Sequence, residues 1–230
     1  MGDLYALDFD GVLCDNCGET AISAVKAAKL RWPELFTTVD SSTEDWIVDQ
    51  MQTVWPVVET GYETLLLVRL LLEIKIPLLQ RSSVTKGLTV EGILETWSAN
   101  RFYPGFPDAL RFASSQLYIV TTKQGRFADA LLRELAGVTI PPERIYALGS
   151  GPKVEVLKML QKQPEHQGLT LHFVEDRLAT LKNVIKEPEL TGWNLYLVDW
   201  GYNTQKEREE AATYSRIHLL QLSDFTQKLK

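Results

Sequence analysis

Leu4-Tyr-Ala-Leu-Asp-Phe-Asp-Gly-Val-Leu-Cys-Asp15 is the stretch that decides the fold, because an apolar strand there leads two carboxylates into a glycine turn. Gly11 permits the sharp turn that ends the strand. We therefore expect Asp8 at the last position of the strand and Asp10 in the loop just beyond it. Asp is also common in ordinary polar turns, so these two residues alone do not indicate a functional site.

The composition is that of an ordinary globular protein. Of the 230 residues, 45% are hydrophobic and 23% are charged, which argues against disorder. The 24 Lys and Arg against 30 Asp and Glu give a formal charge of -6, and no basic stripe is present to attract a nucleic-acid backbone. We therefore expect no nucleic-acid partner.

The sequence also indicates neither export nor membrane insertion. The N-terminus begins directly with a strand pattern and shows no cleavage site, which predicts a cytoplasmic location. The most apolar run, 65–72, contains Arg69 and is far shorter than the roughly 20 residues that a membrane helix needs. We therefore expect a buried helix there and no membrane partner.

Between residues 15 and 100 the pattern is helical. Helices are predicted over 19–31, from a capping box formed by Ser41 and Glu44, after Gly61, and from Thr89. Four such helices can bury one another. The pattern therefore predicts an inserted all-helical domain over 15–100, between core segments 1–14 and 101–230.

From Tyr103 onward strands alternate with helices. Strands are predicted at 116–121, 144–148, 170–175, 195–199 and 217–220. This alternation predicts an α/β fold, a Rossmann-like doubly wound parallel sheet with helices on both faces. In such sheets ligands bind beyond the carboxyl ends of the strands.

Further strand ends carry residues suited to a site: Thr121 with Thr122, Lys153, and Glu175 with Asp176. Lys153 begins a predicted helix, which is an unfavourable place for a cation because of the helix dipole. Its position suggests an anionic partner. A lone threonine would more often cap a helix, and a surface lysine often has no role.

The acidic residues predict a metal ion. Asp8, Asp10, Glu175 and Asp176 would repel one another unless a hard divalent cation joined them, and an oxygen-only ligand set selects Mg²⁺. With Mg²⁺ and Lys153 the four carboxylates still leave a negative excess. Turn amides and a proton held on Asp10 would reduce that excess.

These strand ends together resemble the motifs of the haloacid dehalogenase (HAD) superfamily. DFDGVLCD at 8–15 resembles motif I, LYIVTTK at 117–123 motif II, Lys153 motif III, and LHFVEDR at 171–177 the acidic motif IV. The sequence WGYN at 200–203 resembles a turn common in phosphoglycolate phosphatase-like members. The helical block lies where the C1 caps of the superfamily are inserted.

The resemblance implies a Mg²⁺-dependent phosphatase that hydrolyses a small phosphorylated metabolite through an aspartyl phosphate. Asp8 would be the nucleophile and Asp10 the general acid and base. The resemblance and the charge argument assign phosphate binding to Thr121, Thr122, Lys153 and Gly11, and metal binding to Asp8, Asp10, Glu175 and Asp176. An acid at Asp10 favours phosphoryl transfer over dehalogenation, since halide leaves without protonation.

Two alternatives stay open. The Glu175-Asp176 pair resembles the β-phosphoglucomutase branch, which implies a phosphomutase, and a non-catalytic phospholigand-binding protein could share the fold. In the helical block, Arg69, Arg81 and Lys86 are candidates to meet a second anionic group of the substrate, or are surface cations whose stems cover apolar surface. The sequence assigns no oligomeric state.

Overall fold

The computed structural model describes residues 2–58, 61–75 and 101–229. The chain divides into two compact units. Met1–Asp15 with Phe102–Lys230 form one, here called the α/β unit, and Asn16–Arg101 form the other, the inserted helical unit. Short strands β2 (Cys14–Asp15) and β3 (Arg101–Phe102) pair where the chain leaves and re-enters the α/β unit.

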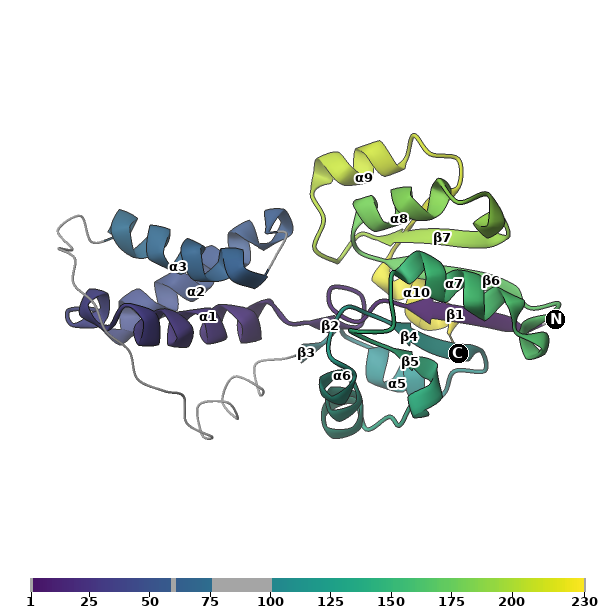
Figure 1. Cartoon of the computed structure of the whole chain (residues 1–230), viewed down its shortest axis with the longest axis horizontal. Helices are drawn as coiled ribbons and strands as arrows, with labels where there is room; N and C mark the ends of the chain where they lie inside the picture. Colours follow the sequence, from purple (N-terminus) through teal and green to yellow (C-terminus); the bar gives the residue numbers. More distant parts are fainter. Residues whose placement is uncertain (1, 59–60, 76–100, 230) are drawn as a thin grey trace. The chain divides into compact units, whose positions relative to one another are not determined.

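Within the described residues, the α/β unit is built on a six-stranded sheet in the order β5-β4-β1-β6-β7-β8, with every neighbouring pair parallel (Figure 1). The strands are β1 (Asp3–Leu7), β4 (Gln116–Val120), β5 (Ile145–Tyr146), β6 (Thr170–Glu175), β7 (Trp193–Val198) and β8 (Ile217–Leu220). The predicted α/β fold with a parallel sheet is confirmed.

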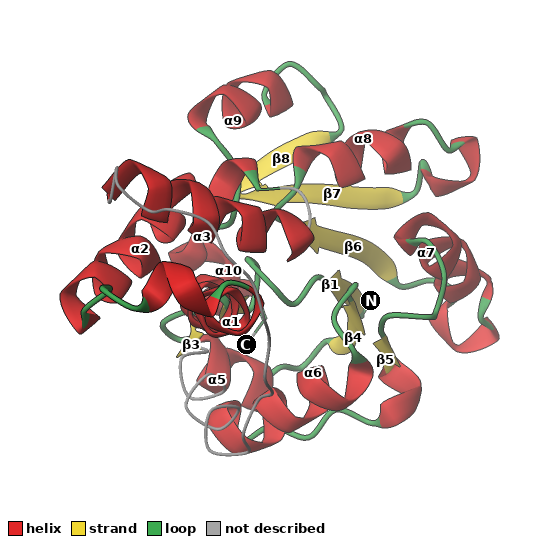
Figure 2. Cartoon of the chain, turned by 60° about the vertical axis from the view of Figure 1, so that its left-hand side comes forward, coloured by secondary structure: helices red, strands yellow, loops and turns green. Residues whose placement is uncertain are grey.

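Helices cover both faces of this sheet, as Figure 2 shows. They are α5 (Phe106–Arg111), α6 (Gly125–Leu131) with a π-helical turn (Leu132–Ala136), α7 (Lys153–Lys162), α8 (Leu178–Ile185), α9 (Gln205–Ala211) and α10 (Leu222–Lys228). Because side chains alternate along a strand, Leu4 packs with α7, α8 and α9 on one face, while Tyr5 on the other face lies 5.8 Å from the Phe225 ring of α10.

The order of the strands determines where a site can form. β1 lies between β4 and β6, and its residues Leu4, Ala6 and Leu7 are fully buried. From β1 the chain builds β4 and β5 on one side, then crosses to β6, β7 and β8 on the other. The carboxyl ends of β1, β4 and β6 therefore meet at the point where the strand order reverses, where ligands bind in open α/β sheets.

Two local features differ from the sequence expectation. Asp40, not Ser41, caps helix α2 (Ser41–Val54), because its carboxylate accepts the Thr43 N–H at 2.9 Å, so the predicted box with Glu44 is wrong. Conversely, α9 was not predicted. A capping box starts it, in which the Thr204 hydroxyl accepts the Glu207 N–H at 3.2 Å and the Glu207 carboxylate accepts the Thr204 N–H at 2.7 Å.

The described part of the inserted helical unit consists of α1 (Cys17–Arg31), α2 and α3 (Gly61–Lys75), with short 3₁₀ turns at Pro33–Phe36 and Trp55–Val57. Its core is formed by Ala21, Ala24, Val25, Ala28, Leu35, Ile47, Met51, Val68, Leu71 and Leu72. The helix predicted from Thr89 lies outside the described residues. Among the described helices, none has the length and apolar character needed to cross a membrane.

Candidate active site

Asp8 directly follows β1 and is held from several sides. Its N–H donates to the Val174 carbonyl at 3.0 Å, which extends the pairing of β1 with β6 by one residue. Its Oδ1 accepts the Phe9 N–H at 2.8 Å, and its Oδ2 lies 2.9 Å from the Lys153 ammonium. The carboxylate is therefore fixed in place, with one oxygen on the main chain and the other on a cation.

Glu175 ends the neighbouring strand β6 and Asp176 directly follows it, and both are almost completely buried. Glu175 Oε1 accepts the N–H groups of Asp176 and Arg177, each at 3.1 Å, and Oε2 accepts the Lys153 ammonium at 2.7 Å. Asp176 Oδ2 accepts the Tyr202 N–H at 2.9 Å. Main-chain N–H groups and the Lys153 ammonium thus give both carboxylates defined orientations.

Asp8, Glu175 and Asp176 form a compact cluster, with one oxygen of each lying within 4.8 Å of the others. Burial, with repulsion from Glu175, raises the pKa of Asp8 to about 7. Burial, with repulsion from Asp8, raises the pKa of Asp176 to about 6. The cluster therefore favours the addition of positive charge, and its oxygen-only donors suit a hard cation such as Mg²⁺.

Lys153, the first residue of α7, supplies one positive charge. Its ammonium contacts both Asp8 and Glu175. Burial disfavours the charged form, but these two carboxylates outweigh burial and raise the pKa of Lys153. The anionic partner expected for a lysine at this helix start is thus a pair of carboxylates.

Asp10 lies outside this cluster and pairs with a residue that the sequence analysis did not select. The Lys123 ammonium is 3.0 Å from Asp10 Oδ1, and the side chains of Lys123 and Asp10 are 11% and 25% exposed. Lys123 is thus a cationic partner of Asp10 within the α/β unit. The only hint in the sequence was the position of Lys123, two residues beyond Thr121.

Thr121 and Thr122 follow β4 but differ in their surroundings. Thr121 is buried, and its hydroxyl oxygen accepts the Lys123 N–H at 3.1 Å. Because that oxygen accepts from the main chain, the hydroxyl proton remains available to donate to a ligand. Thr122 is exposed.

Gly11 has a steric role in this structure. Its φ is +81°, and its N–H donates to the Cys14 carbonyl at 2.8 Å. The amide is thus used within the turn instead of being offered to a phosphate. A Cβ atom at this position would lie 2.2 Å from Asp176 Oδ2, so any side chain here would displace the carboxylate.

The variant Gly11→Ala is therefore expected to lose more stability than its matched control Gly168→Ala. Gly168 has the same φ of +81°, but a Cβ there would meet nothing within 4 Å. We expect Gly168→Ala to cost roughly 1–2 kcal/mol of unfolding free energy from backbone strain, and Gly11→Ala to cost roughly 1–3 kcal/mol more from overpacking. Urea unfolding of both variants measures the difference, and equal losses would show that Gly11 does not pack against Asp176 in this way.

The loop after β7 was also missed as part of the site, although the sequence showed the resemblance of WGYN to a known turn. The Trp200 indole N–H donates to the Val12 carbonyl at 3.0 Å, and the Tyr202 hydroxyl donates to Asp15 Oδ1 at 2.7 Å. Because the Tyr202 N–H also binds Asp176 Oδ2, this loop connects the turn after β1 to Asp176.

Arg69 of the inserted helical unit has partners of its own. It lies 2.9 Å from Glu73 and over the Trp32 ring, 5.0 Å from its centre. The Arg69 guanidinium thus has a carboxylate partner and an aromatic partner within the inserted helical unit. Arg81 and Lys86, the other two candidates for a second anionic group, lie outside the described residues.

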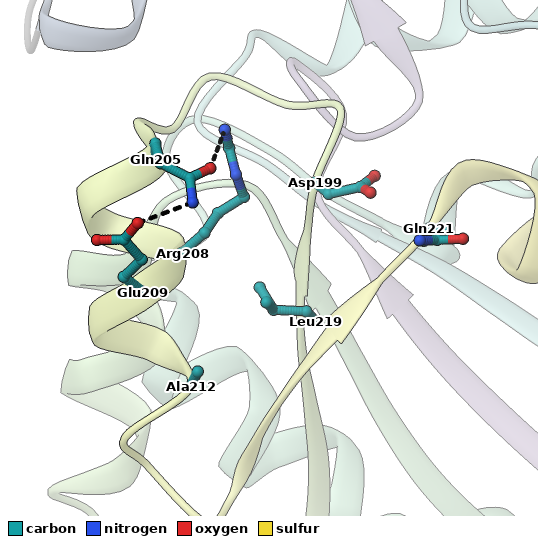
Figure 3. A pocket seen from close by; sticks show the side chains of 7 residues that line it. All are labelled: Asp199, Gln205, Arg208, Glu209, Ala212, Leu219 and Gln221. Atoms are coloured by element: carbon teal, nitrogen blue, oxygen red, sulfur yellow. Dashed lines mark hydrogen bonds between the residues drawn. The ribbon is translucent and has the colours of Figure 1, made fainter.

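A pocket of about 390 Å³ opens beside α9 and β8 (Figure 3). It is lined by Asp199, Gln205, Arg208, Glu209, Ala212, Leu219 and Gln221. Gln205 joins its charged groups, because it accepts from Arg208 at 3.2 Å and donates to Glu209 at 2.9 Å. None of the predicted site residues lines this pocket.

No protein-family model and no curated protein matches the sequence. Solved structures do match the fold. A candidate phosphatase from Clostridium difficile has a TM-score of 0.56 at 14% identity, with 100% of this chain and 99% of that chain covered. A HAD family hydrolase from Deinococcus radiodurans, crystallised with bound phosphate and sodium, has a TM-score of 0.53 at 15% identity, with 95% and 91% covered.

A third structure, described as a predicted phosphatase from Clostridium acetobutylicum, has a TM-score of 0.52 at 14% identity and covers 99% of this chain and 98% of its own. At such low identities the likeness concerns the fold. It extends over nearly the whole length of each chain. The chain therefore has the fold found in haloacid dehalogenase-like hydrolases.

Proposed function

We propose that this protein is a Mg²⁺-dependent phosphatase that hydrolyses a small phosphorylated metabolite through an aspartyl phosphate. The observation that carries the proposal is the cluster of Asp8, Glu175 and Asp176 at two adjacent strand ends, with Lys153 bonded to two of its members. Carboxylates on an exposed patch are solvated by water and need no shared cation to hold them together. Here the acids are buried, oriented and close together.

The donor set fits a divalent metal. Carboxylate oxygens of Asp8, Glu175 and Asp176, with the main-chain carbonyl of Asp10, would hold Mg²⁺. When bound, Mg²⁺ would supply positive charge next to the phosphoryl oxygens as charge shifts during transfer. Lys123, Lys153 and Arg177, which lies 3.9 Å from Asp176, would with one divalent cation more than balance the four carboxylates of the site.

The first chemical step belongs to Asp8 and Asp10. A carboxylate oxygen of Asp8 attacks phosphorus, the bond from phosphorus to the leaving oxygen breaks, and Asp10 gives that oxygen a proton. Arrival of a phosphate dianion would give the site a net negative charge, which favours a proton on Asp10, although the structure pairs Asp10 with Lys123. Lys153 and the Thr121 hydroxyl would hold phosphoryl oxygens.

The second step regenerates the enzyme. Asp10, now ionised, takes a proton from water, the water oxygen attacks phosphorus, and the bond to Asp8 breaks to release inorganic phosphate. We assign the inserted helical unit as the cap, the part of the chain that selects the leaving group.

Hydrolysis of p-nitrophenyl phosphate tests the proposal. We expect turnover with Mg²⁺, loss of turnover when EDTA removes the metal, and recovery when Mg²⁺ is returned in excess. Turnover that is insensitive to EDTA would contradict the metal site. Binding of phosphorylated metabolites without release of phosphate would instead indicate a binding protein, and conversion of a sugar 1-phosphate to its 6-phosphate a mutase.

A further inference from the structure

Asn203 lies where the pairing between β6 and β7 stops. The last residue pair of this ladder is Glu175 with Leu197, so Asp176 is the first residue beyond it. The Asn203 side-chain amide donates to the Asp176 carbonyl at 2.9 Å and to the Val198 carbonyl at 2.8 Å. One buried side chain, 5% exposed, therefore joins the two strands just past the end of the sheet.

The orientation of this amide is fixed by Arg208. The guanidinium donates to Asn203 Oδ1 at 2.8 Å and to the Asn203 main-chain carbonyl at 3.0 Å. Figure 3 shows Arg208 on α9, with its bond to Gln205. Both donors of the Asn203 amide and its acceptor are thus in use, so the amide nitrogen faces the two carbonyl groups.

The loop that contains Asn203 also determines where the Asp176 side chain can lie. The Tyr202 N–H binds Asp176 Oδ2, and the Gly201 main chain lies so close that a Cβ there would be 2.4 Å from Asp176 Cβ. The same Cβ would be 2.6 Å from the Gly11 carbonyl oxygen. Asp176 is therefore confined between two stretches of main chain, and Asn203 fixes one of them to the end of β6.

We propose that Asn203 is a positioning residue for Asp176, acting through the Asp176 main chain and the 200–203 loop. The proposal rests on the metal site proposed above. Without the amide, the carbonyl groups of Asp176 and Val198 lose their donor, and of these links to Asp176 the loop keeps only the Tyr202 N–H bond. Mg²⁺ demands near-ideal geometry, so a small displacement of one ligand weakens binding.

The test is the Mg²⁺ affinity of Asn203→Ala, measured by calorimetry on the whole protein. We expect the Kd to rise by roughly 10–100-fold, as for other residues that orient metal ligands. Asn194→Ala is the matched control. Asn194 also joins β7 to β6, since its amide donates to the Leu171 carbonyl at 3.2 Å, but it lies far along the strands from Asp176. This control is expected to keep the wild-type Kd.

Arg208→Met serves as a second variant in case Asn203→Ala does not fold, because it removes the group that orients the amide. It is expected to weaken Mg²⁺ binding in the same direction by a smaller factor. Folded Asn203→Ala protein with the wild-type Kd, or an unchanged Kd for Arg208→Met if Asn203→Ala is unfolded, would overturn the inference. A wild-type protein that binds no Mg²⁺ would overturn both the inference and the metal site. Mg²⁺ binding that depends on Asn203, without phosphatase turnover, would refute the proposed function alone.

Discussion

Asp8→Asn is expected to lower the turnover of p-nitrophenyl phosphate by roughly 10⁴-fold or more. Asparagine has nearly the same shape as aspartate, but its amide oxygen is a far weaker nucleophile than a carboxylate. The Phe9 N–H can still bond to the remaining oxygen, so the turn after β1 is expected to be retained. The loss should therefore appear in kcat, with the fold unchanged by circular dichroism.

Asp199→Asn is the matched control for this prediction. Asp199 follows β7 at the same edge of the sheet, but it is exposed and is not part of the carboxylate cluster. Its variant is expected to turn over at the wild-type rate. Turnover by Asp8→Asn close to that of Asp199→Asn would exclude Asp8 as the nucleophile.

The same Asp8→Asn variant has an expected stability signature that does not depend on activity. Burial raises the pKa of Asp8 to about 7, above its unfolded value of 3.8, so the stability linked to the protonated form is lost as the pH rises through 7. Without divalent metal, Asp8→Asn should therefore have a higher Tm than the wild type at pH 8. The difference should shrink toward pH 5, where Asp8 is protonated.

Lys153→Met is expected to lower the unfolding free energy by roughly 3–5 kcal/mol at pH 8 without metal, because it leaves buried carboxylates without their cation. Methionine fills a similar volume, so loss of charge is the main change. The ammonium contacts Asp8 and Glu175 with only 13% of its side chain exposed. Burial raises the pKa of Asp8 to about 7 and also raises the pKa of Glu175, so both carboxylates become protonated as the pH falls, and the loss should diminish below pH 7.

Lys182→Met is the control for Lys153→Met. Lys182 lies 2.6 Å from Glu210, but these side chains are 37% and 41% exposed. An exposed pair of this kind contributes at most about 1 kcal/mol. Urea unfolding of both variants compares the same substitution in two environments, and equal losses would mean that the Lys153 cluster is not buried as described.

Much of the fold could be predicted from local patterns. The apolar strand before Asp8, the alternation after Tyr103 and the carboxylates at 175–176 each predict an element or a strand end from neighbouring residues alone. Because parallel strands bring their carboxyl ends to one edge, the closeness of Asp8 to Glu175 and Asp176 followed from the topology.

The remainder depended on contacts between distant segments. Asp10 and Lys123 are 113 residues apart, and their pairing requires β4 to lie next to β1, an order that the sequence does not state. The Asn203 side-chain amide binds the carbonyl groups of Asp176 and Val198, and these two groups come together only when β6 and β7 are side by side. Helix α9 was missed because its polar residues lack the apolar periodicity that indicates a helix.

The most direct test of the central claim is to locate the phosphoryl group during turnover. Wild-type protein would be mixed with Mg²⁺ and excess p-nitrophenyl phosphate, quenched in acid within the first turnover, digested and analysed by mass spectrometry. We expect the mass of one phosphoryl group on the peptide that contains Asp8, and none with Asp8→Asn. A phosphoryl group on another residue, or no adduct at all while p-nitrophenol appears in a burst, would contradict nucleophilic catalysis by Asp8.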